Sequence, residues 1–252
     1  MRNFSKFGVA TAMLLVSLFI GCSNDPEKDS EKPNHRKIDW DENSTIVCIG
    51  TSLTEGYGAG VGFFPIDKTK SWTAHIGQKV NISVENFGVS GITAVEMAEV
   101  ITNGNHDADL ISAAVIIIEL GANDLLRQYD KLPNFDMNFV AKVEKAFEDI
   151  LDHIKALGTN PQIYLAKFYN NNVARDLLPS NLMWIHAQYE SMYSRLKSKY
   201  KVEIINDIWK GIWGNQNLMF DQIHPNAEGY KIMADNIFGS MKGFLEFNDL
   251  VK

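Results

Sequence analysis

Three side chains have the chemical types that nucleophilic catalysis requires. Ser52 lies in a glycine-rich segment at residues 50–58 and could supply a hydroxyl nucleophile. His224 could take the proton of that hydroxyl, while Asp221 would fix the tautomer of the imidazole and stabilise the imidazolium. A spacing of three residues places Asp221 and His224 on the same side of a helical turn or a tight loop. Together the three residues predict acyl transfer.

Each of these segments also has a simpler interpretation. A serine that follows a strand is most often an N-cap, and an Asp-x-x-His segment can be a helix start with a solvated histidine. The glycine-rich segment does not fit a phosphate loop, because it lacks the lysine of GxxxxGK[ST] and the spacing of GxGxxG, and Glu55 would repel a phosphate. The catalytic interpretation therefore depends on the segments meeting at one place in the fold.

Short apolar runs rich in β-branched residues alternate with helical patterns along the chain. The runs predict strands at residues 45–49, 82–86, 114–120, 163–166 and 202–205. Apolar stripes at helical spacing predict helices at 71–80, 93–101, 138–157, 182–199 and 227–244, with Gly158 as a C-cap. The alternation predicts an α/β fold, a three-layer α/β/α sandwich of flavodoxin-like form with a parallel sheet of about five strands.

Four polar segments follow these predicted strands. Residues 50–58 follow the first strand, 86–93 the second and 119–124 the third, while 221–226 lie in the long loop beyond the fifth. Ligands of open parallel sheets bind outside the carboxyl ends of the strands. We therefore expect all four segments, and the chemistry, at that edge of the sheet. Pro225 would limit the conformation of His224 and could start the last helix.

The first 37 residues have the pattern of an export signal followed by a tether. Arg2 and Lys6 precede an apolar stretch at residues 8–21, which as a helix of about 21 Å is too short to span a bilayer. The stretch ends LFIGC and resembles a bacterial lipobox, in which Cys22 is acylated. We expect a signal peptide at 1–21, an acylated cysteine and flexible tether at 22–37, and a single domain at 38–252. The alternative is an ordinary signal peptide with an incidental cysteine.

The charge balance excludes one class of partner. The chain has 24 basic and 31 acidic residues, a net charge of -7. Loss of a leader containing Arg2 and Lys6 would leave 22 basic residues against 31 acidic ones, or -9. No Lys/Arg block offsets this charge, which argues against binding of nucleic acid.

Two cysteines cannot form a disulfide scaffold, and Cys48 lies in an apolar run that predicts a buried free thiol. The oligomeric state stays open.

In this order, the four polar segments resemble the Ser, Gly, Asn and His blocks of the SGNH/GDSL hydrolase family. The resemblance covers nearly all of residues 38–252. The stretches ELGANDLLR at 119–127 and DQIHPNAEGY at 221–230 are most similar to the bacterial thioesterase/lysophospholipase/arylesterase branch. One position departs from the pattern, because Thr51 stands where the GDSL motif has an aspartate. Since a threonine can hydrogen-bond locally, we expect altered tuning of the nucleophile rather than its loss.

The resemblance implies a catalytic set and an oxyanion hole. The catalytic residues would be Ser52, Asp221 and His224. The oxyanion hole would comprise the backbone N–H groups of Ser52 and Gly91 and the side-chain amide of Asn123. A glycine lets the backbone approach the substrate closely, and an asparagine offers a neutral donor that does not compete as a base.

Neither a cofactor nor a metal is expected for this chemistry. His106, with Asp107 and Asp109 close by, could suggest a metal site. A polar lead-in to the third strand is the favoured interpretation of that cluster.

The expected function is that of a serine esterase or lipase-like acyl hydrolase acting on carboxylic esters, with thioesters or lysophospholipids as related substrates. A carbohydrate O-deacetylase would share the catalytic set and prefer a short acyl group. A non-catalytic envelope-binding module would keep only the fold. The partners would be a small-molecule or lipid ester and a membrane reached through the lipid anchor, which places the protein in the cell envelope.

Several apolar residues follow the strands on the expected active edge and have two interpretations. They could line an acyl-chain groove or form a lid, or they could cap the sheet and pack on the last helix. They are Phe63, Phe64, Leu125, Leu126, Ile208, Trp209, Ile212, Trp213, Met219 and Phe220. The asparagine run at residues 170–172 could bind a hydroxyl-rich ligand, but a solvated loop is favoured.

Overall fold

The computed structural model describes residues 35–129, 131, 136–168 and 183–252. Cys22, residues 1–34 of the expected leader and tether, and the asparagine run at 170–172 lie outside the described residues. The expected domain boundaries therefore stay predictions.

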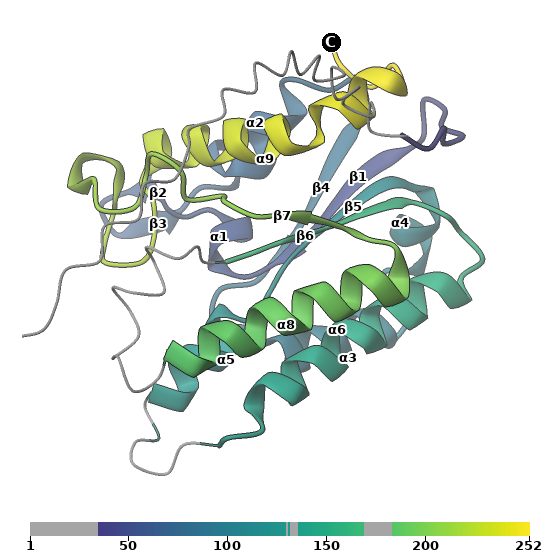
Figure 1. The fold of residues 1–252 in the computed structure, drawn as a ribbon. Helices are drawn as coiled ribbons and strands as arrows, with labels where there is room; N and C mark the ends of the chain where they lie inside the picture. The colour runs from purple at the N-terminus through teal and green to yellow at the C-terminus, as the bar shows by residue number, and fades with distance from the viewer. Residues whose placement is uncertain (1–34, 130, 132–135, 169–182) are drawn as a thin grey trace, which may run out of the picture. The chain divides into compact units, whose positions relative to one another are not determined.

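A five-stranded parallel sheet carries the polar segments. Its strands are β1 (Thr45–Gly50), β4 (Ser83–Gly88), β5 (Ala113–Glu119), β6 (Gln162–Ala166) and β7 (Glu203–Ile205), in the order β4-β1-β5-β6-β7 (Figure 1). Every adjacent pair is parallel, and all seven residues of β5 are buried. Burial on both faces explains why residues 113–118 of β5 are an unbroken apolar run rather than an alternating one. The predicted fold class is confirmed.

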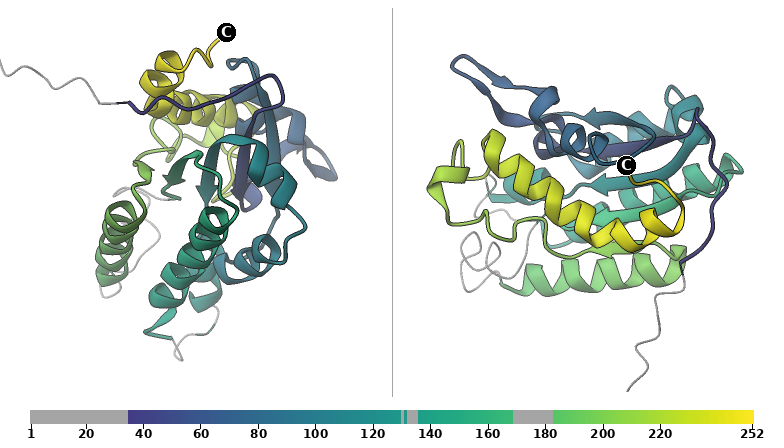
Figure 2. Two further views of the ribbon diagram at one scale, coloured as in Figure 1. Left: turned by 90° about the vertical axis from the view of Figure 1, so that its right-hand side faces the viewer. Right: turned by 90° about the horizontal axis from the view of Figure 1, so that it is seen from above.

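Helices cover both faces of the sheet (Figures 1 and 2). One face holds α2 (Trp72–Gly77) and α9 (Ala227–Phe247), which contact each other. The other holds α3 (Ala94–Thr102), α6 (Phe139–Ala156) and α8 (Met183–Tyr200), with contacts from α3 to α6 and from α6 to α8. The buried stripe of α6 runs from Phe139 to Ile154, and Gly158 follows the helix with φ of 75°. The left-handed conformation there suits a residue without a Cβ.

Several elements were not foreseen. A hairpin of β2 (Tyr57–Val61) and β3 (Phe64–Ile66) follows the short helix α1 (Ser52–Glu55). The helix expected at 71–80 is the shorter α2 (Trp72–Gly77), and a 3-10 turn, η1 (Lys68–Lys70), comes just before it. Short elements also occur as α4 (Asp107–Ser112), α5 (Ala122–Tyr129) and η3 (Gln216–Leu218).

The start of the last helix differs from the expectation for Pro225. Helix α9 begins at Ala227, and the side chain of Asn226 caps it by accepting the Gly229 N–H at 3.1 Å. Pro225 instead pairs with Met219 in an isolated antiparallel bridge. The proline therefore fixes the loop that carries His224 and does not open the helix.

No helix among the described residues is long and apolar enough to cross a membrane. Cys48 is fully buried and is a free thiol, and burial raises its pKa well above the ordinary value. The thiol is therefore a packing group of β1.

Candidate active site

Ser52 lies on a tight turn at the carboxyl end of β1. Thr51 caps α1, its hydroxyl accepting the Leu53 N–H at 3.4 Å, and Ser52 is the first residue of that helix. Gly56 ends the helix with φ of 95°, a conformation that favours glycine. A Cβ at Gly50 would overlap the Thr54 side chain, so the turn can be this tight only with a glycine there. The turn lifts the serine hydroxyl out of the strand end.

The structure brings Ser52, His224 and Asp221 into one hydrogen-bonded series. The hydroxyl of Ser52 lies 2.9 Å from Nε2 of His224. On the other side of the imidazole, Nδ1 of His224 lies 2.8 Å from Oδ2 and 3.0 Å from Oδ1 of Asp221. Ser52 and His224 are 172 positions apart in sequence, so only the tertiary fold brings them together. This is the geometry of a nucleophile, a base and a group that orients the base.

Asp221 is held as an anion by its own loop. Its Oδ1 accepts the N–H groups of Ile223 at 2.9 Å and His224 at 2.8 Å. Burial acts to raise the pKa of Asp221, but the Ile223 hydrogen bond and the contact with His224 outweigh it, and the pKa lies below its ordinary value. A charged carboxylate fixes the proton of His224 on Nδ1 and leaves Nε2 free to accept. The ring of Tyr57 packs on the imidazole, with centroids 4.6 Å apart.

A buried carboxylate lies beneath the serine turn. Glu119 is fully buried at the end of β5, and its Oε2 accepts the Thr51 N–H at 3.2 Å, the Thr51 hydroxyl at 2.9 Å and the Thr54 hydroxyl at 3.1 Å. Burial raises the pKa of Glu119 to about 7, although the hydrogen bonds from Thr51 and Thr54 lower it. Thr51, the residue that departs from the GDSL pattern, therefore donates to a carboxylate of the neighbouring strand.

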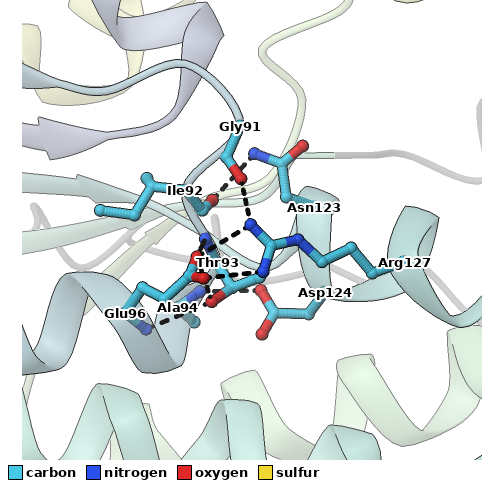
Figure 3. A network of polar contacts seen from close by, with 8 residues as sticks. All are labelled: Gly91, Ile92, Thr93, Ala94, Glu96, Asn123, Asp124 and Arg127. Atoms are coloured by element: carbon cyan, nitrogen blue, oxygen red, sulfur yellow. Dashed lines mark hydrogen bonds and ion pairs between the residues drawn. The ribbon is translucent and has the colours of Figure 1, made fainter.

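The loop after β4 is fastened to α5 by a polar network (Figure 3). The amide of Asn123 donates to the Ile92 carbonyl at 2.8 Å, and the guanidinium of Arg127 donates to the Gly91 carbonyl at 2.9 Å. Arg127 also binds both oxygens of Glu96, at 2.7 and 3.0 Å, and this contact lowers the pKa of Glu96 to about 2. Asp124 accepts the Ala94 N–H at 2.8 Å. The network sets Gly91 and Asn123 relative to each other.

The same loop is tied to the serine turn. One oxygen of Glu55 accepts the backbone N–H of Ser90 at 2.8 Å and its hydroxyl at 2.5 Å. The Val89 N–H donates to the Gly50 carbonyl at 3.1 Å. Gly91 follows with φ of 78°. Glu55, which argued against a phosphate loop, therefore joins the segment of Ser52 to the segment of Gly91.

Donors remain for a negatively charged oxygen. Within the part of the chain that the structure describes, neither the Ser52 N–H nor the Gly91 N–H has a protein acceptor. Asn123 uses one of its two amide hydrogens on Ile92, which leaves the second. The family resemblance implies these three donors for an oxyanion hole, and that role stays a prediction.

Five residues that support the site were not singled out from the sequence as supports. They are Glu55, Ser90, Glu119, Arg127 and Tyr230, whose buried hydroxyl donates to the Tyr57 carbonyl at 2.7 Å. One signal was present: Thr93 and Glu96 have the spacing of a capping box, and the structure shows its reciprocal bonds. A capping box predicts where a helix starts, but it does not predict which arginine will bind the glutamate of the box.

The His106 cluster belongs to the packing between helices. Asp107 bonds to Nε2 of His153 at 2.7 Å, and the ring of His106 packs against Phe87 with centroids 4.4 Å apart. Among the described residues, no group of three or more His, Cys, Asp or Glu side chains is arranged to hold a metal ion.

The apolar residues of the active edge divide into two sets. The core includes Leu125, Ile208, Trp209 and Ile212, and Trp213 and Met219 pack against it. Large parts of Phe63, Phe64 and Phe220 are exposed. Packing therefore accounts for most of the set, and the exceptions are Phe63 and Phe64 of the hairpin and Phe220 of the His224 loop.

A hollow of about 610 Å³ lies at the other end of the sheet, lined by residues that include Arg36, Trp40, Ile111 and Asn160. It contains none of the serine, histidine and aspartate set. Cavity volume alone therefore does not locate the candidate active site. The hydrogen-bonded series of Ser52, His224 and Asp221 locates it instead.

The sequence that forms this site matches a known family pattern. The sequence pattern described as "GDSL-like Lipase/Acylhydrolase family" matches residues 48–232. That span is most of the chain and includes Ser52, Gly91, Asn123, Asp221 and His224. No curated protein matches the chain.

Solved structures share the fold. TesA is 20% identical with a TM-score of 0.61, over 80% of this chain and 100% of that one. The psychrotrophic esterase EstA from Pseudoalteromonas sp. is 21% identical with a TM-score of 0.59, over 81% and 99%. The lipase Lip_vut3 from a goat rumen metagenome is 21% identical with a TM-score of 0.60, over 78% and 97%.

Proposed function

The chain belongs to the GDSL-like lipase/acylhydrolase family, and from this premise we propose that it is a serine esterase that cleaves carboxylic esters. Ser52 is the nucleophile, His224 the general base and Asp221 the group that orients the base. One observation carries the proposal: the Ser52 hydroxyl, the His224 ring and the Asp221 carboxylate lie in series at 2.9 and 2.8 Å. A binding module would have no need of such a series.

The reaction proceeds through two acyl transfers. The Ser52 oxygen attacks the ester carbonyl while Nε2 of His224 takes the hydroxyl proton. The tetrahedral intermediate collapses, the bond to the alcohol oxygen breaks, and His224 returns the proton to the departing alcohol. Water then attacks the acyl-serine with His224 again as base, which releases the acid and restores Ser52.

The negative charge that develops on the carbonyl oxygen is met by the N–H groups of Ser52 and Gly91 and by the free amide hydrogen of Asn123. Donors held in place by the fold stabilise that charge without reorganising during the reaction. The network of Arg127, Glu96 and Asp124 supports this role, because it holds the Gly91 loop against α5.

We also propose that the protein is a lipoprotein of the cell envelope. The lipobox-like LFIGC places an acylated cysteine at Cys22, followed by a polar tether and the hydrolase domain at 38–252. Two or more acyl chains suffice for stable anchoring.

Labelling with a fluorophosphonate tests the catalytic proposal. The folded protein at neutral pH should gain one phosphonyl group, and peptide mapping should place it on Ser52. Ser52→Ala should abolish labelling, and His224→Ala should slow it by at least a hundredfold, while Ser240→Ala on the surface of α9 should label like the native chain. Folded protein that takes no label, or takes it at another serine, would contradict the proposal.

Esters of increasing acyl length then define the substrate class. Hydrolysis of acyl chains longer than acetyl is the expected result. Activity confined to acetate would favour the carbohydrate O-deacetylase instead.

A further inference from the structure

The β2–β3 hairpin presents large apolar side chains to solvent. Val61 is 75% exposed, Phe63 99% and Phe64 80%. Residues 61–66 contain no charged side chain. Figure 2 shows this hairpin, in blue, extending away from the sheet in the view from above. We propose that this hairpin tip, residues 61–66, inserts into a lipid surface and so brings Ser52 to esters held in that surface, a role that rests on the proposed esterase function.

The base of the hairpin lies against the catalytic histidine. Tyr57, the first residue of β2, packs its ring on His224 at 4.6 Å. The ring of Phe220 lies 5.8 Å from Tyr57, and Phe220 is 44% exposed. A Cβ at Gly58 would meet Phe220 and the Pro225 carbonyl, so the hairpin approaches the His224 loop closely. A surface bound at the tip therefore lies on the same side of the molecule as the reaction.

The glycines of the hairpin let its tip project from the domain. Gly62 turns the chain with φ of 59°, and a Cβ there would meet nothing within 4 Å. Gly60 has no room for a Cβ because β3 passes close to it, so the two strands approach tightly. A narrow projection ending in the exposed side chains of Phe63 and Phe64 fits insertion into a deformable apolar phase.

The charges beside the tip suit an anionic surface. Segment 57–71 contains Lys68 and Lys70 against Asp67 alone, a net charge of +1 in a chain of net -7. Asp67 pairs with Lys70 at 3.0 Å, and no ion pair of Lys68 is recorded among the described residues. Lysines next to exposed aromatic side chains are the combination that binds the interface of anionic bilayers.

The length of chain before the described domain is consistent with contact. Twelve residues lie between Cys22 and His35, and this segment spans at most about 45 Å when extended. An acylated Cys22 would keep the domain near the bilayer, but His35 lies against Phe244 and Phe247 near the carboxyl end of α9, so the tether does not by itself direct the hairpin to the surface. The proposal does not require the anchor, because the tip and its lysines belong to the domain itself.

A fluorescent probe at the tip tests insertion. In the full chain with Cys22→Ser, Cys48 is buried, so Val61→Cys provides an accessible thiol for an environment-sensitive dye and keeps both phenylalanines. Vesicles of phosphatidylcholine and phosphatidylglycerol should shift the emission to the blue and brighten it severalfold. The matched control is Ile111→Cys on α4, where the native side chain is 55% exposed. Emission at that control site should change little.

Adding Phe63→Ser and Phe64→Ser to the Val61→Cys chain should reduce vesicle affinity at least tenfold. No shift at position 61, or an equal shift at 111, would overturn the proposal. A blue shift that grows with protein concentration without vesicles would overturn it in favour of contact with a second copy.

The kinetic arm compares two substrates. Phe63→Ser/Phe64→Ser should lower hydrolysis of a vesicle-embedded ester at least tenfold and leave a soluble short-chain ester within twofold. An equal loss on both substrates would assign the phenylalanines to acyl binding and overturn the proposal. The probe experiment needs no turnover, so failure of the proposed esterase function and failure of lipid insertion are separately visible.

Discussion

In the proposed mechanism, Asn123 serves two acceptors at once. One amide hydrogen holds the Ile92 carbonyl at 2.8 Å, and the other is available to the substrate oxygen. We expect Asn123→Ala to lower kcat by about 10²–10³-fold, the usual effect of one lost oxyanion donor, with KM changed much less. Steady-state kinetics on a soluble ester measure this. Unchanged turnover would remove Asn123 from the mechanism.

Glu119 makes the stability of the fold depend on pH. Its pKa is raised to about 7 from an ordinary 4.5, so between these values the native state binds a proton that the unfolded chain releases. The stabilisation is complete below pH 4.5 and is lost as the pH rises to about 7. Relative to Glu119→Gln, the native chain should lose about 3 kcal/mol of unfolding free energy over that range.

Urea unfolding at a series of pH values measures this difference. Glu99→Gln, at an exposed position on α3, is the matched control and should run parallel to the native chain. If the unfolding free energy of Glu119→Gln changes with pH in the same way as that of the native chain, the Glu119 carboxyl does not titrate in the native state over this range.

Residue types and spacing were enough to find Ser52, His224 and Asp221 as candidates. The partners of Glu119 could not be found in this way. They depend on the register that sets Gly50 opposite Glu119 across β1 and β5, which no local pattern encodes. The effect of Thr51 in place of the family's aspartate can be interpreted in physical terms only once that register is known.

At the scale of elements, Arg127 connects α5 to the loop of Gly91. A lysine cannot bind both Glu96 oxygens and the Gly91 carbonyl together, since it lacks the planar fork of the guanidinium. We expect Arg127→Lys to lower kcat/KM by roughly tenfold, because Gly91 and Asn123 lose their common support. The ion pair is half exposed and should contribute little to stability, so Tm should fall by only about 2 °C.

The chain offers a matched control for that change. Arg195 binds both oxygens of Glu144 at 2.7 Å between α8 and α6, away from the serine turn. Arg195→Lys should have a similar small effect on Tm and none on kcat/KM. Equal activity of the two variants would show that the Arg127 network does not position the site.

The strands and long helices follow from local patterns, and the short elements do not. The β-branched runs located all five strands of the parallel sheet, because burial on both faces leaves a continuous apolar signal. The hairpin at residues 57–66 was missed, since it is rich in glycine and lacks the alternation of a half-buried strand. Pro225 was misassigned because a bridge to Met219 holds it in the loop, two residues before α9 begins at Ala227.

At the scale of the whole molecule, the proposed membrane attachment can be tested separately from the proposed catalysis. We expect Cys22→Ser to abolish incorporation of labelled palmitate and to shift the protein from the membrane fraction to the soluble fraction. Fluorophosphonate labelling of Ser52 should be unchanged, because Cys22 has no role in the proposed acyl transfer. Palmitate incorporation that persists in the variant would contradict acylation at Cys22.

The 172-residue separation of Ser52 from His224 also has a consequence in time. At about 5–20 residues per second, a ribosome needs roughly 10–30 s to travel from the nucleophile codon to the base codon. Asp221 and His224 arrive in one short loop, just ahead of the final helix. In the proposed mechanism the growing chain then has the nucleophile without its base, so a product truncated before Asp221 should cleave no ester.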